Sequence, residues 1–229
     1  GRDGRLEIQV DARNYVRLGV SSALTLNTLR DDGVALSLTE GMATLRLNRF
    51  NRDKEYFEVD APNATLAVER KGLYRIDVTP TEDSNDRNAR VAVTVRDGGL
   101  ARADLLASDT EASDWQFSAA SDSYDEWDHW NDERDRVIAS YQNNYNSNLP
   151  DVWGADELSS YGSWSYTNTY GWLRQPYPQY ISIYNNWTPY RYGYWDWFAP
   201  YGWTWVGYEP WGWTPYHYGR WLYYNNAWC

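Results

Sequence analysis

Two carboxylates, Asp196 and Glu209, lie among tryptophans and tyrosines near the end of the chain. A pair of carboxylates beside exposed aromatic rings is the arrangement of a glycoside hydrolase, in which one protonates the leaving group. No spacing in the sequence brings these two residues together, so the pair is weak evidence. The chain also has no Ser/His/acid or Cys/His arrangement, no phosphate-binding glycine loop and no dinucleotide fingerprint. We therefore expect a protein that is not an enzyme.

The histidines and acidic residues are the candidate metal ligands. His129 lies between Asp128 and Asp132, but no second histidine stands at ligand spacing, so these aspartates are interpreted as an acidic helix face. His217 replaces Arg191 in a repeated motif, which favours a structural role. Calcium prefers carboxylate oxygens, and its candidate ligands are Asp109, Glu111, Asp114, Asp122 and Asp125. Their order is not that of a dedicated calcium loop. No cofactor is expected, with calcium in this acidic stretch as the open alternative.

Aromatic residues carry the stronger signal. The stretch WTPYRYGYW, residues 187–195, returns as WTPYHYGRW, residues 213–221, with seven of nine positions identical. Shorter or looser versions lie at residues 161–164, 170–172, 200–205 and 210–215. Repetition of this kind is typical of stacked supersecondary units. We expect short β-hairpin repeats in this part of the chain.

These aromatic residues have a structural and a functional interpretation. Trp and Tyr bury large areas and carry one polar group that can bond a turn, so they can form a core, with Gly at the turns. Residues 141–229 nevertheless hold 30 of the 40 aromatic residues, more than one small core needs. We expect some at an interface, where Trp and Tyr are favoured anchors, or stacked on a ligand. The candidates are Trp187, Tyr190, Tyr192, Trp195, Trp203, Trp205, Trp211, Trp213, Tyr216, Tyr218 and Trp221.

Composition limits the partners. The chain has 229 residues, of which 42% are hydrophobic, which is enough for a sizeable core, and its formal net charge is −11. Acidic residues concentrate in residues 104–136, opposed there only by Arg134 and Arg136. This balance argues against nucleic acid and anionic lipid as partners. The single cysteine, Cys229, allows no internal disulfide.

No apolar run approaches the roughly 20 residues of a membrane helix, so no transmembrane segment is expected. The chain does not begin with Met, and we expect that a targeting segment precedes Gly1. Asn63 and Asn186 begin glycosylation sequons, whose use depends on the host.

Alternating apolar and polar residues dominate the first hundred positions, which predicts strands with one wet face. Turn residues such as Asp31–Gly33, Glu40–Gly41 and Asp97–Gly99 separate the runs, and residues 81–88 read as a loop. This rhythm favours a β-sandwich or a short β-solenoid. The expected strands cover residues 6–10, 16–18, 24–26, 34–38, 45–47, 57–59, 65–69, 74–78 and 91–95.

Four stretches in this part, residues 41–47, 57–64, 72–78 and 93–98, resemble in their order the FecR-type domain. Asp60 stands where that family usually has Thr, which places the chain in a divergent branch. The aromatic tail resembles the uncharacterised region attached to FecR-like domains in bacterial envelope proteins. The resemblance implies a β-rich extracytoplasmic protein, periplasmic, surface-bound or secreted, and no established activity for the tail. The iron-transport signalling known for some FecR proteins is not carried over.

The acidic stretch contains the one expected helix, over residues 124–140. Ser123 and Glu126 have the spacing of a capping box, and Trp127, Trp130, Val137 and Ile138 mark one apolar stripe. The stripe predicts packing against a sheet. The sequence thus predicts a mainly β protein in three parts: a FecR-like domain at 1–103, an acidic linker with this helix at 104–140, and an aromatic repeat region at 141–229.

Two functions fit these features. The first is a structural protein of the bacterial envelope or surface that joins copies of itself, as a homo-oligomer or filament, through β edges and aromatic patches. The second is a monomeric module that binds polysaccharide or peptidoglycan through exposed Trp and Tyr. The first protein should associate as its concentration is raised, whereas the second should stay monomeric.

Overall fold

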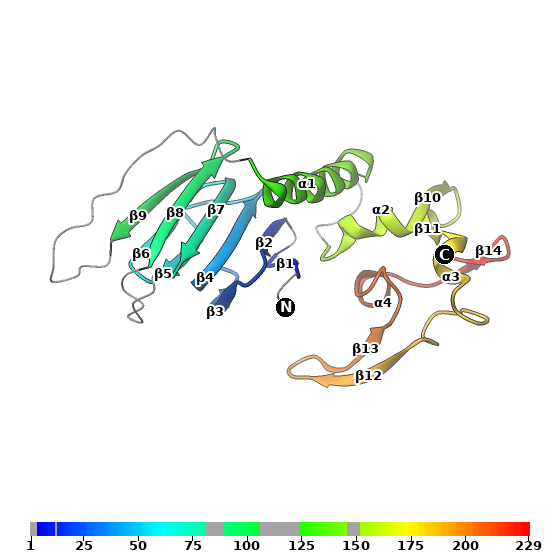
Figure 1. The fold of residues 1–229 in the computed structure, drawn as a ribbon. Helices are drawn as coiled ribbons and strands as arrows, with labels where there is room; N and C mark the ends of the chain where they lie inside the picture. The colour runs from blue at the N-terminus through cyan, green and yellow to red at the C-terminus, as the bar shows by residue number, and fades with distance from the viewer. Residues whose placement is uncertain (1–3, 12, 81–88, 106–123, 146–151) are drawn as a thin grey trace. The chain divides into compact units, whose positions relative to one another are not determined.

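The computed structural model describes residues 4–11, 13–80, 89–105, 124–145 and 152–229. Its internal contacts divide the chain into two units, Gly1–Asn131 and Asp132–Cys229. The boundary falls inside helix α1 (Glu126–Tyr145), whereas the sequence predicts a three-part division. We call these the N-terminal unit and the aromatic unit, and each is described by itself (Figure 1).

The N-terminal unit is made of β-strands, as the alternation predicts (Figure 1). Its strands are β1 (Leu6–Gln9), β2 (Asn14–Leu18), β3 (Ala23–Arg30), β4 (Gly33–Leu47), β5 (Tyr56–Ala61), β6 (Ala64–Arg70), β7 (Gly72–Thr79), β8 (Arg90–Arg96) and β9 (Leu100–Leu105). Strand β9 is not among the expected strands, because alanines occupy two of its positions and weaken the alternation. The expected loop at 81–88 lies outside the described residues.

Strand β4 belongs to two sheets. Residues 33–40 pair with β3 and, in parallel, with β5, whereas residues 41–47 pair with β2 and β7. The change occurs at Gly41, whose φ is +86°, a left-handed value that glycine adopts without strain. The two expected strands at 34–38 and 45–47 are therefore one bent strand, and the expected turn at Glu40–Gly41 is its bend.

Apolar side chains from both sheets meet in one core. Leu36, Leu38 and Leu45 of β4 are almost fully buried, together with Val59 of β5 and Ile76 of β7. All but one of the strand pairings in the described part of this unit are antiparallel. The arrangement is therefore a sandwich of two sheets that share β4, and the solenoid alternative does not apply.

A polar row crosses the outer face of the sheet that contains β2 and β7. The register places Glu7, Arg17, Thr44, Arg75 and Thr94 directly opposite one another on neighbouring strands. The first turns of α1 cover part of this row. Trp127 donates its indole N–H to Thr44 Oγ1 at 2.9 Å, and Arg17 Nη1 donates to the side-chain and backbone oxygens of Asn131. The predicted packing of the helix against a sheet is thus observed for Trp127.

Helix α1 begins with a reciprocal cap between Asp125 and Asp128. The Asp128 backbone N–H donates to Asp125 Oδ1 at 3.0 Å, and the Asp125 N–H donates to Asp128 Oδ2 at 3.3 Å. The expected pair was Ser123 and Glu126, two residues earlier, and Ser123 lies outside the described residues. Aspartate caps a helix as well as serine does, so composition alone did not select the correct pair.

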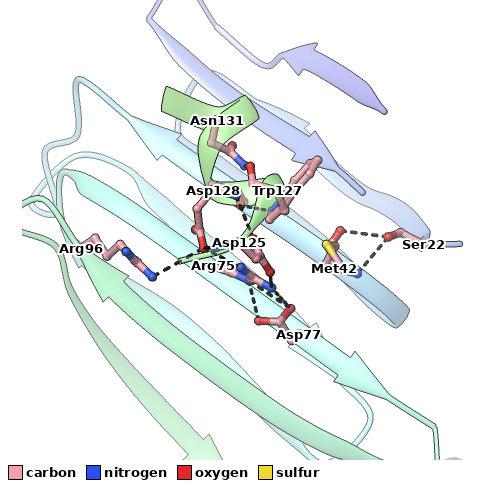
Figure 2. Close-up of polar contacts among 10 residues, drawn as sticks. Ser22, Met42, Arg75, Asp77, Arg96, Asp125, Trp127, Asp128 and Asn131 are labelled. Carbon is pink, nitrogen blue, oxygen red and sulfur yellow. Dashed lines mark hydrogen bonds and ion pairs between the residues drawn. The ribbon is translucent and has the colours of Figure 1, made fainter. Parts of the chain in front are cut away.

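Arg75 holds this cap to the sheet (Figure 2). Its guanidinium lies 2.8 Å from Asp128, 2.9 Å from Asp125 and 2.9 Å from Asp77. Burial alone would raise the pKa of Asp125, but the hydrogen bond and charge of Arg75 outweigh it and lower the pKa to about 2. The Asp125 carboxylate is therefore ionised at neutral pH and forms an ion pair with the arginine.

The aromatic unit contains the rest of α1 and a series of short elements (Figure 1). They are a 3-10 turn (Ala155–Glu157), α2 (Leu158–Tyr161), β10 (Gly162–Thr167), β11 (Gly171–Pro176), α3 (Pro178–Ile181), β12 (Gly193–Phe198), β13 (Gly202–Gly207), α4 (Thr214–His217), β14 (Tyr223–Tyr224) and β15 (Ala227–Trp228). The strands pair as three antiparallel hairpins, in agreement with the expected hairpin architecture. Among the described residues, no helix is both long and apolar enough to cross a membrane.

Candidate interaction surface in the aromatic unit

Glu209 is buried at the centre of the aromatic unit and is 3% exposed. Its Oε1 accepts hydrogen bonds from the indole N–H of Trp187 and the hydroxyl of Tyr216, each at 2.8 Å. Trp187 belongs to the first copy of the nine-residue motif and Tyr216 to the second. Burial first, and then the hydrogen bond and charge of Glu209, raise the pKa of Tyr216 above its usual value. One carboxylate therefore joins the two copies.

The two copies adopt different conformations. Tyr190 of the first copy has a left-handed φ of +60°, whereas its counterpart Tyr216 lies in α4. The first copy leads into strand β12, but the second continues into irregular chain. The rings of Tyr190 and Tyr216 contact each other edge to face, with centroids 5.0 Å apart. The repeated sequence thus builds two partners of one core.

Hairpin β12–β13, whose position in the unit is seen in Figure 1, carries exposed aromatic rings on both faces. Trp197 and Trp203 are opposite each other in the register and are 61% and 67% exposed. Tyr194 and Phe198 alternate with the tryptophans along β12, so they lie on the other face, and both are exposed. At the tip, Tyr201 is 83% exposed. A soluble monomer rarely exposes so large an aromatic surface.

Ring contacts order the first face of the hairpin. Trp197 and Trp203 meet edge to face with centroids 5.7 Å apart, and Trp195 packs in the same manner on the buried Trp205. The ring of Tyr190 lies parallel to that of Trp195. Edge-to-face pairs fix ring orientation at little entropic cost. The hairpin therefore presents a preorganised aromatic surface. Such a surface loses less conformational entropy when it binds a partner.

An aromatic cleft of about 250 Å³ lies elsewhere in the same unit. Trp172 and Tyr218, both exposed, line it together with Trp221. Arg174 and Arg220 are its charged lining residues. Arg174 is buried and donates from Nε to the carbonyl of Leu158, whereas Arg220 is exposed. The cleft thus combines aromatic walls with one accessible positive charge.

The aromatic unit matches a described family. A family model for a family of unknown function (DUF6600) matches residues 155–229. No curated protein matches the chain. Two crystal structures of a "putative anti-sigma factor" from Parabacteroides distasonis ATCC 8503 are similar to 46% of the chain at 10% identity, with a TM-score of 0.30. The chain matches 57% of the length of that solved protein.

The structure separates the candidate aromatic residues into three groups. Trp205, Trp211 and Tyr216 are buried and form the core of the unit with Ala155 and Leu158, so they are not surface anchors. Three others are half-buried: Trp187, Tyr192 and Trp221. The exposed ones are Tyr190, Trp195, Trp203, Trp213 and Tyr218. Of these, Trp195 and Trp203 lie on the hairpin, and Tyr218 lines the cleft.

The candidate carboxylates have unlike environments. Glu209 is enclosed by its aromatic partners, whereas Asp196 is exposed on β12 and its Oδ1 accepts the backbone N–H of Trp197. Neither lines the cleft. Glu209 therefore serves as an internal hydrogen-bond acceptor, and the arrangement offers no open pair of carboxylates at the cleft.

The candidate metal ligands are engaged in other contacts. Asp128 faces Arg75, and the ring of His129 packs edge to face on Tyr124. Within the described ranges, His, Cys, Asp and Glu form no group of three or more suited to a metal ion. For calcium, Asp125 is bound to Arg75, and the remaining four candidates, Asp109, Glu111, Asp114 and Asp122, lie outside the described residues.

His217 has a structural environment. Its Nε2 lies 3.0 Å from the carbonyl oxygen of Trp205, and its ring stacks on Trp213. Burial lowers the pKa of His217 below its usual value, although the hydrogen bond to that carbonyl acts in the opposite direction. The ring is therefore neutral at pH 7 and bridges α4 to β13.

Several residues of this surface are not among the sequence candidates. Three of them lie outside the two copies of the motif: Trp197 and Tyr201 of the hairpin and Trp172 of the cleft. The fourth, Arg220 of the cleft, lies at a position that differs between the copies. A signal was present for the hairpin, because a Pro–Tyr–Gly turn at residues 200–202 separates two runs of alternating aromatic residues. No comparable signal marks the cleft, whose walls come from distant segments.

Proposed function

We propose that this protein is a non-enzymatic structural protein that joins copies of itself through the aromatic surface of its C-terminal unit. The observation that carries the proposal is hairpin β12–β13, a two-stranded ribbon with exposed rings on both faces. Burying such rings is the main source of binding free energy in protein interfaces, where Trp and Tyr dominate the hot spots. Exposure of these rings to water is unfavourable on both faces of the hairpin, and a protein partner can bury both faces.

The polarity of the hairpin favours a protein partner over a glycan. Between residues 193 and 207 the only charged side chain is Asp196, and Thr204 is buried. Sugar sites need hydrogen-bonding groups around the ring platform to satisfy the hydroxyls, and this ribbon supplies few. Sheet edges add a second means of association. Edge strand β3 exposes Leu26 and Leu29 and contains neither Lys nor Pro, the residues that commonly block strand addition.

We further propose an extracytoplasmic location, in the envelope or at the cell surface. The support is the resemblance of the N-terminal strands to FecR-type domains and of the tail to the region that follows them in bacterial envelope proteins. Fractionation of cells that produce the protein from its native gene tests this location. Recovery in the cytoplasm alone would contradict it.

Sedimentation velocity over a wide dilution series tests self-association. We expect species larger than the 26.8 kDa chain that either dissociate on dilution or persist as kinetically stable polymers. A single species of monomer mass at every concentration would exclude the proposal.

A monomeric glycan-binding module is the second candidate. The parallel rings of Tyr190 and Trp195, separated by 6.3 Å between centroids, favour it, because parallel exposed rings can stack on a sugar face. Retention on immobilised polysaccharide or peptidoglycan, with a change in Trp fluorescence, would support this function. A Trp195→Ala variant should then lose retention without changing the mass of the protein in solution.

A further inference from the structure

We propose that the tip of hairpin β12–β13 in one copy docks into the aromatic cleft of a second copy. The inference rests on the proposed self-association and names the two surfaces that meet. The inserted group is Tyr201, the most exposed of the large hydrophobic side chains in the described part of the chain. The receiving walls are Trp172, Tyr218 and Trp221.

Size supports this pairing. A cleft of about 250 Å³ can hold one aromatic side chain but not a whole hairpin. Tyr201 stands at the turn between β12 and β13, so it can enter a narrow cleft ahead of the flanking tryptophans. A tyrosine also suits walls of this kind, because its ring packs edge to face on other rings and its hydroxyl can reach a polar neighbour.

Charge is complementary between the two surfaces. The hairpin carries one charged side chain, the exposed Asp196, and the charged residues that line the cleft are both arginines. Arg174 is buried with its guanidinium against the ring of Trp211, so the exposed Arg220 is the one available to a partner. At about 3.3 Å per residue, Asp196 stands roughly 10 Å back from the tip along the hairpin. We assign Asp196 and Arg220 as a pair across the interface.

Residues 193–207 of the same chain do not line the cleft, so its own hairpin does not fill it, and the complementary charges of Asp196 and Arg220 favour a second copy as the occupant. Tip and cleft are different surfaces, so the contact is heterologous. Each copy that donates its tip keeps a free cleft. Repetition of the contact gives an open chain of subunits unless the rotation between copies closes a ring.

The first experiment exchanges the charges in the full 229-residue chain. Asp196→Arg and Arg220→Asp should each weaken association by about tenfold or more, because like charges then face each other. The double variant should recover most of the loss. Arg191→Asp alters an exposed arginine outside the cleft and serves as the control. Equal association of all four variants and the wild type would overturn the inference.

The second experiment separates tip from cleft. Tyr201→Ser removes the inserted ring and leaves the cleft, whereas Arg220→Asp impairs the cleft and leaves the tip. Each variant alone should remain monomeric at protein concentrations at which the wild type associates. A mixture of the two should form dimers and no larger species. Tyr208→Ser, which removes a similarly exposed tyrosine outside both surfaces, is the control. A mixture that stays monomeric, or a Tyr208→Ser variant that behaves as Tyr201→Ser does, would contradict a tip-to-cleft contact.

These outcomes also separate the inference from the proposed function. A monomeric wild-type protein contradicts both. Wild-type association that is unaffected by Tyr201→Ser and Arg220→Asp contradicts only the tip-to-cleft contact and leaves self-association standing. If Arg220→Asp instead abolishes retention on polysaccharide without affecting association, the occupant of the cleft is a saccharide and the inference is wrong. Near-UV circular dichroism of each variant checks that the aromatic unit remains folded.

Discussion

At the scale of single residues, Glu209 is the polar centre of the aromatic unit. Its Oε1 accepts from one donor in each copy of the motif, and its buried Oε2 has no hydrogen-bond partner among the residues that the structure describes. A buried carboxylate is stable only when its hydrogen bonds offset the cost of removing it from water. The unit should therefore be unusually sensitive to this position.

Glu209→Ala should lower the free energy of unfolding of the aromatic unit by about 2–4 kcal/mol, because it leaves one buried and one part-buried donor unpaired and a cavity behind. Glu209→Gln keeps an acceptor oxygen and should cost less, about 1 kcal/mol. Urea unfolding followed by Trp fluorescence measures both. An alanine variant as stable as the glutamine variant would show that these hydrogen bonds do not hold the copies together.

Asp125 gives the N-terminal unit a dependence on pH. Its pKa is lowered to about 2, from 3.8 in its ordinary state, so the ionised cap stabilises the folded state above about pH 4. As the pH falls from 4 towards 2, the unfolded chain takes up the proton first and this contribution is lost. Because Asp125 is half exposed, we expect the effect to be small, about 0.5–1 kcal/mol.

Asp125→Asn isolates the charge, because asparagine is also a good helix cap. The variant should be less stable than the wild type at pH 6, and the difference should shrink between pH 4 and pH 2. Unfolding in urea at several pH values, followed by far-UV circular dichroism, measures it. A difference that stays constant with pH would argue against the ion pair with Arg75.

The sequence identified Glu209 as a candidate but not its role. Its hydrogen-bond partners are 22 residues before it and 7 after it, and no local pattern connects them. The same limit applies to Arg75. Its partners Asp125 and Asp128 are distant from it in sequence, and residues 106–123, which lie between, are outside the described residues. Ionic partners that are distant in sequence cannot be read from spacing.

At the scale of elements, the bend of β4 at Gly41 joins the two sheets. A Cβ at this position would lie 2.5 Å from Ser22 Cα and 2.7 Å from the Ser21 carbonyl oxygen, and the φ of +86° is itself unfavourable for other residues. Gly41→Ala should therefore cost more than the roughly 1 kcal/mol of a left-handed alanine alone.

Gly98→Ala is the matched control, because Gly98 also has a positive φ, +76°, but has open space around its Cα. Its cost should stay near 1 kcal/mol. Thermal or urea unfolding of both variants compares them. Equal losses would mean that the contact with Ser21 and Ser22 relaxes and that the bend tolerates a side chain.

The exposed tryptophans of the hairpin should act on association rather than on folding. Replacing Trp197 and Trp203 together by Thr removes one edge-to-face pair and should cost about 1 kcal/mol of stability, while it strongly reduces association. Trp205→Thr should instead act mainly on folding. It should lower the free energy of unfolding by about 3–5 kcal/mol, because Trp205 is buried. Sedimentation and urea unfolding on the same samples distinguish the two effects. Unchanged association without Trp197 and Trp203 would remove the hairpin from the interface.

Elements were predictable where a local pattern determines them. Alternation located most strands, and the helix was found because Trp127 and Ile138 share a buried stripe. The sequence did not predict that residues 34–38 and 45–47 form one strand, β4. A glycine within a strand has the same local pattern as a turn, and only the pairing with neighbouring strands distinguishes the two. The different conformations of the two repeat copies were also missed, since tertiary contacts override the same local sequence.

At the scale of the whole molecule, the chain combines a polar β-sandwich with a unit rich in aromatic residues. The sandwich has its own core, and the aromatic unit has a second core around Trp205, Trp211 and Tyr216. The aromatic residues beyond that second core lie partly on hairpin β12–β13 and partly around the cleft. Composition predicted this excess, but only the structure separates its buried part from its exposed part.

The most direct measurement is electron microscopy of the negatively stained wild-type protein, at a concentration where sedimentation detects association, beside the Tyr201→Ser variant. We predict regular, open-ended polymers for the wild type and particles no larger than single chains for the variant. Wild-type protein that remains as isolated 26.8 kDa particles at every concentration would contradict the account.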